Sequence, residues 1–422
     1  MKIFSRRQEA MLLFFVALVV GCGALFFYLT TPEAGQGIIY AAGGLILLLF
    51  LLHILLIWFN SDADQLLLPL AAMLTVLGLL GIYRVDPMLA ARQWLWLMLG
   101  LAMLGMVVCF FKDYRVLEDY KYVFMVLAII FLGITVLLGT TVGGARAWLD
   151  FGFLRFQPAE VVKLLVIFFL AGYLQETKEI LTARKSYGFV ALPEPRSMAP
   201  LVLMAVISLG LLVLQKDLGA ALIFFGIFLI MLYTSTGRFS FLLSGLVFFA
   251  LGAIAAYILF GHFRLRVSVW LNPWSKIDTA GYQITQSLFA LASGGFFGTG
   301  FGLGQPQVIP AAATDLIFAV LTEELGMVGG IGIITIYMLL SYRGFRAALL
   351  AKDDFGMLLA TGLTALLALQ SFVILSGVMK LLPLTGVTLP FASYGGSSLL
   401  ISFILLGLVM NVGASGHKGA ER

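Results

Sequence analysis

Few ionisable side chains interrupt the apolar stretches of this sequence, and five groups of them could carry chemistry. Such a residue is unfavourable beside hydrocarbon unless it is paired, solvated or used in function. The groups are Glu160 with Lys163, Lys216 with Asp217, Asp315, Glu323 with Glu324, and Lys380. All five map to the same half of a membrane, and Asp315 is the lone carboxylate among them. A carboxylate facing several cations is suited to act as a base on a substrate that bears phosphate.

Four of these groups also have a structural interpretation. For Glu160 with Lys163 it is an i,i+3 ion pair. For Lys216 with Asp217 it is a solvated turn, and for Glu323 with Glu324 it is packing against another helix. For Asp315 the structural interpretation is a carboxylate at a helix N-terminus, with Thr314 before it as the N-cap. The residues alone leave these alternatives open.

The composition predicts a membrane protein. Of 422 residues, 61% are apolar and 11% are charged, whereas soluble domains carry about 25% charged residues. Cys22 and Cys109 lie in apolar runs and are expected to be small buried hydrophobes. No cleavage site follows the first apolar run, so we interpret it as a signal anchor. The net charge of +5 is attributed to the bias of cytoplasmic loops rather than to nucleic-acid binding.

The fold class we expect is an all-α integral membrane protein, a polytopic bundle of about 12 transmembrane helices. The apolar stretches fall at residues 10–30, 38–59, 65–83, 93–111, 122–141, 157–175, 199–214, 217–236, 240–261, 315–341, 356–378 and 392–413. Only Lys216 and Asp217 separate the seventh stretch from the eighth, and we expect a tight turn there.

The loop charges predict cytoplasmic N- and C-termini. Cations are concentrated in the loops 112–121, 176–198 and 342–355, at Arg238, and in the tail with Lys418 and Arg422. The opposite face is not free of cations, because it carries Arg84, Arg92, Arg146, Arg155, Arg264 and Arg266. Binding of an anion at the outer face would explain them.

One outside segment, residues 262–314, is unusually long and is rich in glycine, amide and aromatic side chains. Its aromatic residues favour an ordered loop seated at the membrane interface. The run Gly294–Gly300 superficially matches a nucleotide-binding loop, but it follows no strand and opens no βαβ unit. We interpret it as flexible backbone near the interface. The sequence contains no zinc spacing and no serine hydrolase or haem signature.

Taken together, the motifs resemble those of the SEDS family (shape, elongation, division and sporulation; FtsW, RodA and SpoVE), which polymerise glycan strands of peptidoglycan from lipid II. The matching segments, in order, are Gly144–Trp148, Arg155–Glu160 with Lys163, Asp217–Gly219, Arg264 with Arg266, Gly281–Gln283, Gln286–Ser287, Ser293–Gly295 with Gly298 and Gly300, Thr314–Ala319, Glu323–Gly326, Pro390–Phe391 and Ser393–Ser398. Each motif alone is weak, whereas their order and spacing over ten helices are specific.

The sequence departs from the family pattern in two places. The family usually spans the membrane ten times, so residues 1–61 are expected to form two extra N-terminal transmembrane helices. Residues 62–415 would form the polymerase core, including the outside loop 262–314, and residues 416–422 a short cytoplasmic tail. The family often has an acidic residue and a His just before the Thr-Asp pair, where this chain has Ala311 to Ala313.

The resemblance implies an inverting glycosyltransferase at the outer face of the bacterial cytoplasmic membrane. The donor would be a glycan linked to undecaprenyl diphosphate, and the acceptor would be the GlcNAc 4-hydroxyl of lipid II. Asp315 is the expected catalytic base. The cations expected to bind the diphosphate are Arg146, Lys163, Lys216, Arg264, Arg266 and Lys380, and the expected supporting residues are Trp148, Gln157, Glu160, Asp217, Tyr282, Gln286, Ser397 and Ser398.

No cofactor is implied for certain. A divalent cation (Mg or Mn) could share the diphosphate, but no dedicated ligand cluster is visible. The expected protein partner is a class B penicillin-binding protein, a transpeptidase with one membrane anchor. Two rival functions are a lipid II flippase and a non-catalytic scaffold for that transpeptidase. The sequence leaves open whether the role lies in elongation, division or sporulation.

Overall fold

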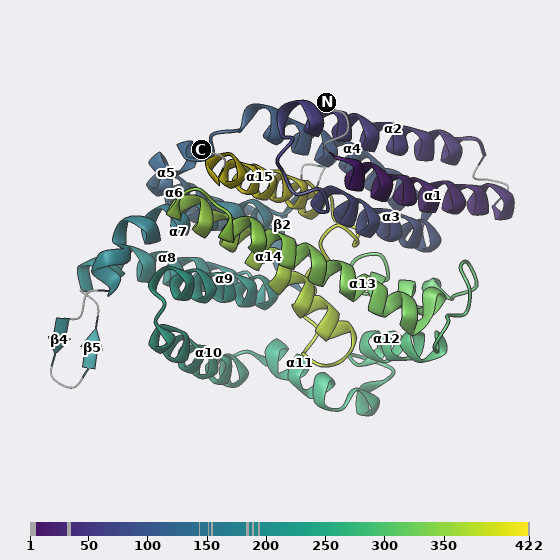
Figure 1. The fold of residues 1–422 in the computed structure, drawn as a ribbon. Coiled ribbons are helices and arrows are strands. Elements are labelled where there is room, and N and C mark those ends of the chain that lie inside the picture. Colours follow the sequence, from purple (N-terminus) through teal and green to yellow (C-terminus); the bar gives the residue numbers. More distant parts are fainter. Residues whose placement is uncertain are drawn as a thin grey trace.

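The computed structural model describes residues 6–31, 35–142, 144–150, 152, 155–182, 185–187, 190–192 and 195–420. Within these ranges, eleven helices are long and apolar enough to cross a membrane. They lie roughly side by side in one bundle (Figure 1). The chain is therefore a multi-pass membrane protein of the all-α class. Arg184 and Arg422, two of the loop and tail cations, lie outside the described residues.

The membrane helices follow the predicted apolar stretches. They are α1 (Arg7–Thr30), α2 (Gly37–Phe59), α3 (Leu67–Val85), α4 (Pro87–Phe110), α6 (Lys121–Leu138), α7 (Pro158–Thr182), α9 (Leu218–Thr236), α10 (Phe239–Leu259), α13 (Ile317–Leu349), α14 (Asp354–Val378) and α15 (Gly396–Ala420). The seventh predicted stretch is α8 (Pro195–Leu214), whose apolar part, Met198–Leu214, is shorter than the others. A turn of three residues separates α8 from α9, as the Lys216–Asp217 interruption predicts.

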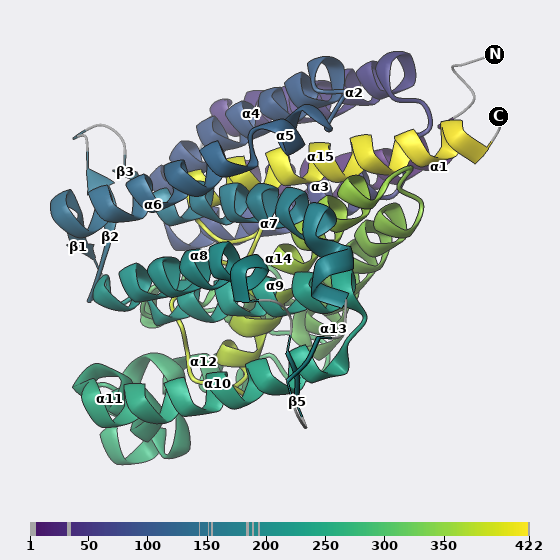
Figure 2. The same ribbon diagram turned by 90° about the vertical axis from the view of Figure 1, so that its left-hand side faces the viewer.

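The core of the bundle is formed by α7, α14 and α15, whose membrane windows are largely buried, whereas α10 is almost wholly exposed. The start of α1 and the end of α15 lie at the same end of the bundle (Figure 2). At this end the side-chain amide of Asn60 donates to that of Asn411 at 2.7 Å. We call it the termini end, and we call the opposite end, where α6 ends and α7 begins, the site end.

The two cysteines do not lie in this core. Cys22 on α1 is exposed and Cys109 on α4 is half-buried, and neither forms a disulfide. The expectation that both are buried is therefore wrong. An apolar run that spans a bilayer has a face toward lipid as well as a face toward protein, and the run alone does not tell which face a residue occupies.

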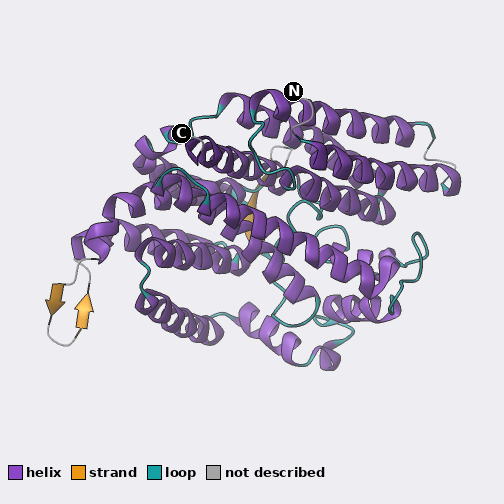
Figure 3. Cartoon of the chain, in the orientation of Figure 1, coloured by secondary structure: helices purple, strands orange, loops and turns teal. Residues whose placement is uncertain are grey.

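Strands occupy little of the chain (Figure 3). At the site end, β1 (Thr140–Val142), β2 (Ala145–Asp150) and β3 (Arg155–Phe156) form an antiparallel sheet in that order, and β4 (Lys185–Tyr187) pairs with β5 (Val190–Leu192) elsewhere. The sequence analysis did not predict these strands. The three-stranded sheet connects α6 to α7 and carries the segment that includes Arg146 and Trp148.

The N-terminal helix pair is attached to the bundle through a buried charge. The guanidinium of Arg6, which is fully buried, donates to the carbonyl oxygens of Asn60 at 3.1 Å and Ala63 at 2.7 Å. It also pairs with Glu9, whose other oxygen contacts His53 Nδ1 at 2.6 Å. Because a buried cation must be paired to be tolerated, these contacts fix α1 against α2 and the turn into α3.

The long segment 262–314 is folded rather than looped. It contains α11 (Gly261–Leu271), the 3₁₀ turn η3 (Pro273–Lys276), α12 (Tyr282–Ser293) and the 3₁₀ turn η4 (Pro306–Val308). The expectation of order is met, and the order comes from short helices that the sequence analysis did not place.

The run Gly294–Gly300 has a different role from the flexible backbone we expected. Helix α13 is kinked at Gly326, where φ is 72°, and the backbone of Gly298 lies directly against this kink. The amide of Thr299 donates to the carbonyl of Glu323 at 3.0 Å, and that of Gly300 to the carbonyl of Glu324 at 3.2 Å. The glycines thus permit two backbones to approach without Cβ atoms between them.

Substituting Gly326 should therefore lower stability. In Gly326→Ala the new Cβ would meet the backbone of Gly298 and would require a positive φ, which costs about 1–3 kcal/mol before any overpacking. Gly332→Ala is the matched control, because it lies on the same helix with no atom within 4 Å of the added Cβ. We expect a lower thermal midpoint in detergent for Gly326→Ala alone. Equal midpoints for the two variants would contradict this account of the kink.

Candidate functional site

Several predicted site residues converge at the site end of the bundle. They come from the start of α7, the α8–α9 turn, α11, α12, the turn 311–316 before α13, and the loop 379–395 between α14 and α15. Figure 1 shows α11 and α12 below this end of α13 and α14. The site is thus assembled from segments that are far apart in the sequence, and it depends on the bundle for its geometry.

Asp315 lies in a tight turn rather than in a helix. Its amide donates to the carbonyl of Ala311 at 3.0 Å, and Ala311 has a φ of 52°. Helix α13 begins only at Ile317, without a side-chain cap. The hydroxyl of Thr314 donates to the carbonyl of Ala311 at 3.3 Å. The expectation that Thr314 caps this helix is therefore wrong, because the turn takes up its hydroxyl.

The surroundings of Asp315 favour a carboxyl that exchanges a proton. Burial raises the pKa of Asp315 above its usual value, while the charge of Arg266 and a hydrogen bond from the side chain of Gln283 act against this rise. Gly386 of the 379–395 loop lies beside it, because a Cβ on that glycine would be 3.6 Å from Asp315 Oδ2. A carboxylate with a raised pKa is a stronger base than a solvated one.

Lys163 and Glu160 form the ion pair that their spacing predicts. The Lys163 ammonium lies 2.8 Å from a Glu160 oxygen, and both side chains are buried. It also donates to Gln370 Oε1 of α14 at 2.8 Å. The amide nitrogen of Gln370 in turn donates to the carbonyl of Thr388 at 2.9 Å. This chain of bonds connects the start of α7 to the 379–395 loop.

Ser398 joins the same network, whereas Ser397 is buried beside it. The hydroxyls of Thr388 and Ser398 are 2.9 Å apart. The loop is also tied to the Asp315 turn, because the amide of Tyr394 donates to the carbonyl of Ala313 at 2.8 Å. The hydroxyl of Ser398 thus helps to hold the loop that passes between Lys163 and Asp315.

Asp217 caps helix α9 and contributes a second carboxylate. It accepts a hydrogen bond from the amide of Ala220 at 3.0 Å, and the side-chain amide of Gln157 lies 3.5 Å from its other oxygen. Burial raises the pKa of Asp217, and the Ala220 amide and the charges of Lys163 and Arg266 oppose that rise. Asp217 is thus part of a charged network and not a solvated turn residue.

Arg266 lies between these groups. Its guanidinium donates to the carbonyl oxygens of Leu384 at 3.4 Å and Thr385 at 3.1 Å, both in the 379–395 loop. Its charge acts on both Asp315 and Asp217. Arg266 is therefore the one predicted cation that connects the two carboxylates and the loop within the described residues.

The other predicted cations lie around this cluster. Arg146 donates to the carbonyls of Gly139 at 2.7 Å and Leu137 at 2.9 Å, at the end of α6. Arg264 donates to the carbonyl of Ile258 at 2.8 Å, at the end of α10. Such contacts satisfy the last carbonyls of a helix. The structure gives both residues a helix-capping role.

Lys216 and Lys380 occupy turns with left-handed backbone, with φ values of 62° and 61°. The carbonyl of Lys380 accepts a hydrogen bond from the Trp270 indole at 3.1 Å. Lys216 lies near Arg266, because both charges act on the same side chain, that of His262. Burial lowers the pKa of His262, and the two charges lower it further.

The remaining supporting residues are less closely engaged. Trp148 lies on β2, where its carbonyl accepts from the Thr140 hydroxyl at 3.1 Å. The Tyr282 hydroxyl is 3.5 Å from the carbonyl of Val308. Gln286 is half-buried on α12. These contacts place the three residues around the site end without bringing them into the Arg266 network.

Some of the charges predicted to lie at the outer face have structural partners instead. Glu324 pairs with Arg84 of α3 at 3.1 Å, which matches the expected packing against another helix. Glu323 accepts from the amide of Gln305 at 3.2 Å. Arg155 pairs with Asp150 at 2.9 Å. Arg84 and Arg155 therefore need no bound anion to explain them.

Sequence reasoning missed Gln370 and the role of Thr388. An amide in the middle of the apolar helix α14 was a signal for Gln370. No signal marked Thr388, because it accepts the bond from Gln370 through its backbone carbonyl, a group that every residue has. Gln283 appeared in a motif without a stated role. Within the described residues, no group of three or more His, Cys, Asp or Glu side chains could hold a metal ion.

Known proteins with similar sequences belong to one family. The model of the cell cycle protein family of FtsW, RodA and SpoVE matches residues 64–418. The peptidoglycan glycosyltransferase RodA of Mycobacterium tuberculosis is 41% identical over 99% of this chain and 92% of its own. Stage V sporulation protein E of Bacillus subtilis is 32% identical over 84% of this chain and 97% of its own.

Solved structures give the same result. A chain of a peptidoglycan synthase complex that coordinates polymerization and crosslinking superposes with a TM-score of 0.70 and 29% identity, over 84% of this chain and 99% of that one. The rod shape determining protein RodA of Thermus thermophilus superposes with a TM-score of 0.61 and 30% identity, over 83% of this chain and 96% of that one. This chain therefore belongs to the FtsW, RodA and SpoVE family.

Proposed function

We propose that this chain is a peptidoglycan glycosyltransferase that polymerises glycan strands from lipid II. The observation that carries the proposal is Asp315, a carboxyl with a raised pKa beside Arg266 and Gln283. The relatives named peptidoglycan glycosyltransferase support it. Asp315 would act as the base, and the surrounding cations would hold the diphosphate.

The reaction follows from these roles. Asp315 takes the proton of the acceptor GlcNAc 4-hydroxyl as its oxygen forms a bond to C1 of the donor sugar. The bond from C1 to the diphosphate oxygen breaks on the opposite face, and undecaprenyl diphosphate leaves as an anion. One displacement inverts the configuration at C1, so a single carboxylate suffices. Cations that meet the leaving oxygen stabilise the transition state.

Of these cations the sequence favours Lys163 and Arg146, but we prefer Arg266 to Arg146, because Arg146 caps the end of α6. Arg266 is held by two neutral carbonyls, which leaves its charge to act on an anion. Lys163 shares its charge with Glu160, and Gln370 fixes its position from the other side. Glu160 is therefore a positioning residue. The other predicted cations, which would extend the positive rim toward the rest of the substrate, are Arg146, Lys216, Arg264 and Lys380.

We further propose that the site end faces the outside of the cytoplasmic membrane and that both termini are cytoplasmic. The cation-rich loops lie at the termini end, where Arg115 contacts Asp353 and Arg343 contacts Asp64. Cytoplasmic loops of membrane proteins carry an excess of cations, which supports this orientation. Lipid II with its sugars exposed outside would then reach Asp315.

The proposed partner is a class B penicillin-binding protein with one membrane anchor. The similar chain in a peptidoglycan synthase complex supports a partner of this kind. Crosslinking of the glycan strands would come from that partner.

Substituting Asp315 should abolish polymerisation. We expect Asp315→Asn and Asp315→Ala to make no glycan strands from labelled lipid II when the chain is purified with its penicillin-binding partner. A base removed from such a site costs about 10²–10⁴ in rate. Asp278→Asn, an exposed carboxylate of the same segment, is the control and should retain activity. If the wild-type chain moved lipid II across the membrane of vesicles and made no polymer, the result would instead favour a flippase.

Activity should fall as pH falls through the raised pKa of Asp315, because the base is then protonated. The charge of Arg266 favours the carboxylate, so Arg266→Gln should move this acid limb to higher pH as well as slow the reaction. Lys276→Gln, a cation that contacts Ser268, should leave the limb in place. Identical acid limbs for wild type and Arg266→Gln would count against Asp315 as the titrating base.

Removing the Lys163 charge should slow the chemical step. We expect Lys163→Met to lower kcat by about 10²–10³, the effect of deleting one group that stabilises developing negative charge. Lys178→Met removes a cation of the same helix that pairs with Asp354 at 2.8 Å, and it should retain the wild-type kcat. An unchanged kcat in Lys163→Met, with the protein folded, would remove Lys163 from the mechanism.

A further inference from the structure

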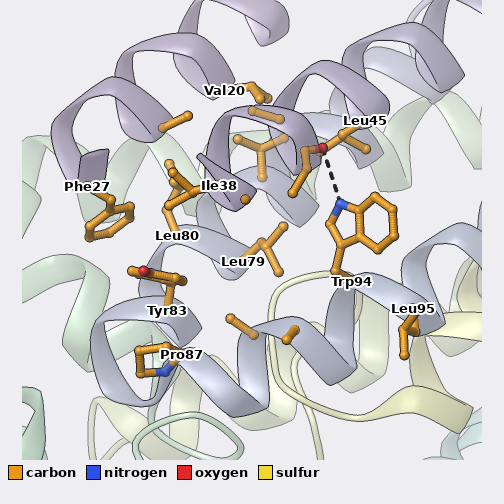
Figure 4. A pocket seen from close by; sticks show the side chains of 17 residues that line it. Val20, Phe27, Ile38, Leu45, Leu79, Leu80, Tyr83, Pro87, Trp94 and Leu95 are labelled. Carbon is orange, nitrogen blue, oxygen red and sulfur yellow. Dashed lines mark hydrogen bonds between the residues drawn. The ribbon is translucent and has the colours of Figure 1, made fainter. Parts of the chain in front are cut away.

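A cavity lies away from the Asp315 site, between the N-terminal helix pair and the bundle. Its volume is about 430 Å³, and α1, α2, α3 and α4 each contribute to its wall. This volume falls within the range of about 300–1,000 Å³ that is usual for ligand sites. Figure 4 shows the side chains of Phe27, Leu80 and Tyr83 on one side and Trp94 on the other.

The wall is almost entirely hydrocarbon. Val20, Leu45 and Val76 are buried at its back, and the ring of Tyr83 packs on that of Phe27 with centroids 4.4 Å apart. The Trp94 indole nitrogen is satisfied by the carbonyl of Ala41 at 3.3 Å. The cavity therefore selects for an apolar guest rather than for water.

The cavity lies in the half of the membrane nearer the site end. Its lining comes from the last part of α1 and α3 and the first part of α2 and α4. Its mouth includes Ala91 and Leu95, which are exposed, Leu95 to 61%. Because α4 spans the membrane, these residues face lipid. A lipid chain can therefore enter sideways from the same leaflet.

Arg92 is not part of the cavity lining, but it adjoins the mouth because it follows Ala91 directly on α4. It is exposed, and it shares a face of α4 with Leu95 at i,i+3. Arg84, by contrast, is paired with Glu324. Within the part of the chain that the structure describes, no hydrogen bond or ion pair is recorded for Arg92. It lies about one and a half turns from the start of α4 at Pro87, near enough for its guanidinium to extend to the headgroup level.

We propose that this pocket binds one acyl chain of an anionic phospholipid, with Arg92 meeting the lipid phosphate. The apolar wall accounts for the chain, and the unpaired cation at the mouth accounts for the charge of the headgroup. The lipid fills the space between the helix pair and the bundle, where an empty cavity would forfeit dispersion contacts. This site is independent of the glycosyltransferase reaction.

The test uses the purified full chain in vesicles of phosphatidylcholine that contain phosphatidylglycerol with a photoreactive group on its acyl chain. Labelling should concentrate on residues that line the cavity, as mapped by mass spectrometry. Ala42→Phe, which fills the cavity, should reduce this labelling to the level of the bulk membrane. Gly43→Phe is its matched control: the neighbouring residue is exposed and has no atom within 4 Å of an added Cβ. It should label as wild type does.

The headgroup is tested separately. Arg92→Gln should reduce the preference for phosphatidylglycerol over phosphatidylcholine about fivefold, the equivalent of about 1 kcal/mol for one cation at an anionic surface. Lys352→Gln, an exposed cation at the termini end, should leave the preference unchanged.

A second measurement guards against misfolding of the filled variant. Phosphatidylglycerol should raise the thermal midpoint of wild type and Gly43→Phe in detergent, because a ligand that binds the folded state stabilises it. It should not raise that of Ala42→Phe or of Ala91→Phe at the mouth. Undiminished cavity labelling in both filled variants would overturn the proposal. So would equal labelling by phosphatidylcholine, or displacement of the lipid by a polyprenyl phosphate at lower concentration.

Discussion

The site depends on how Arg266 is held. Its guanidinium is anchored on two carbonyls of the 379–395 loop, and its charge acts on the carboxyls of Asp315 and Asp217. A buried carboxylate without a cation nearby would be protonated, and a cation without acceptors would not remain there. One side chain of α11 thus acts on two carboxyls drawn from distant parts of the chain, and at Asp217 it adds to the Ala220 amide and the charge of Lys163.

The backbone around Arg266 is held in uncommon conformations. Within the described residues, the non-glycine residues with positive φ are Lys216, Ala311, Lys380 and Phe391. All four lie in the site-end turns, on the Asp217, Asp315 and 379–395 segments. Each such residue costs about 1–3 kcal/mol and persists only where the surroundings enforce it. The packed helices below supply that enforcement, which leaves the turns rigid enough to orient charged groups.

Sequence reasoning was most successful where a feature is local. The helices followed from apolar runs long enough to cross a bilayer, and the Glu160–Lys163 pair followed from its i,i+3 spacing. It failed where a residue's role depends on a distant partner. Thr314 lost its expected capping role to a turn made by Ala311, and Gln370 meets Lys163 across 207 positions of sequence. Spacing in one chain carries no information about such contacts.

The N-terminal helix pair is joined to the rest of the bundle in two different ways. The alignment with the mycobacterial relative spans 99% of this chain and so includes α1 and α2, whereas the alignment with the Bacillus sporulation protein spans 84%. At the termini end the pair is fixed by the buried Arg6 and Glu9. At the site end it meets α3 and α4 across an apolar cavity instead. Buried charges therefore fix the pair at the termini end, whereas at the site end the rings of Phe26 and Phe27 pack on Phe301 beside that space.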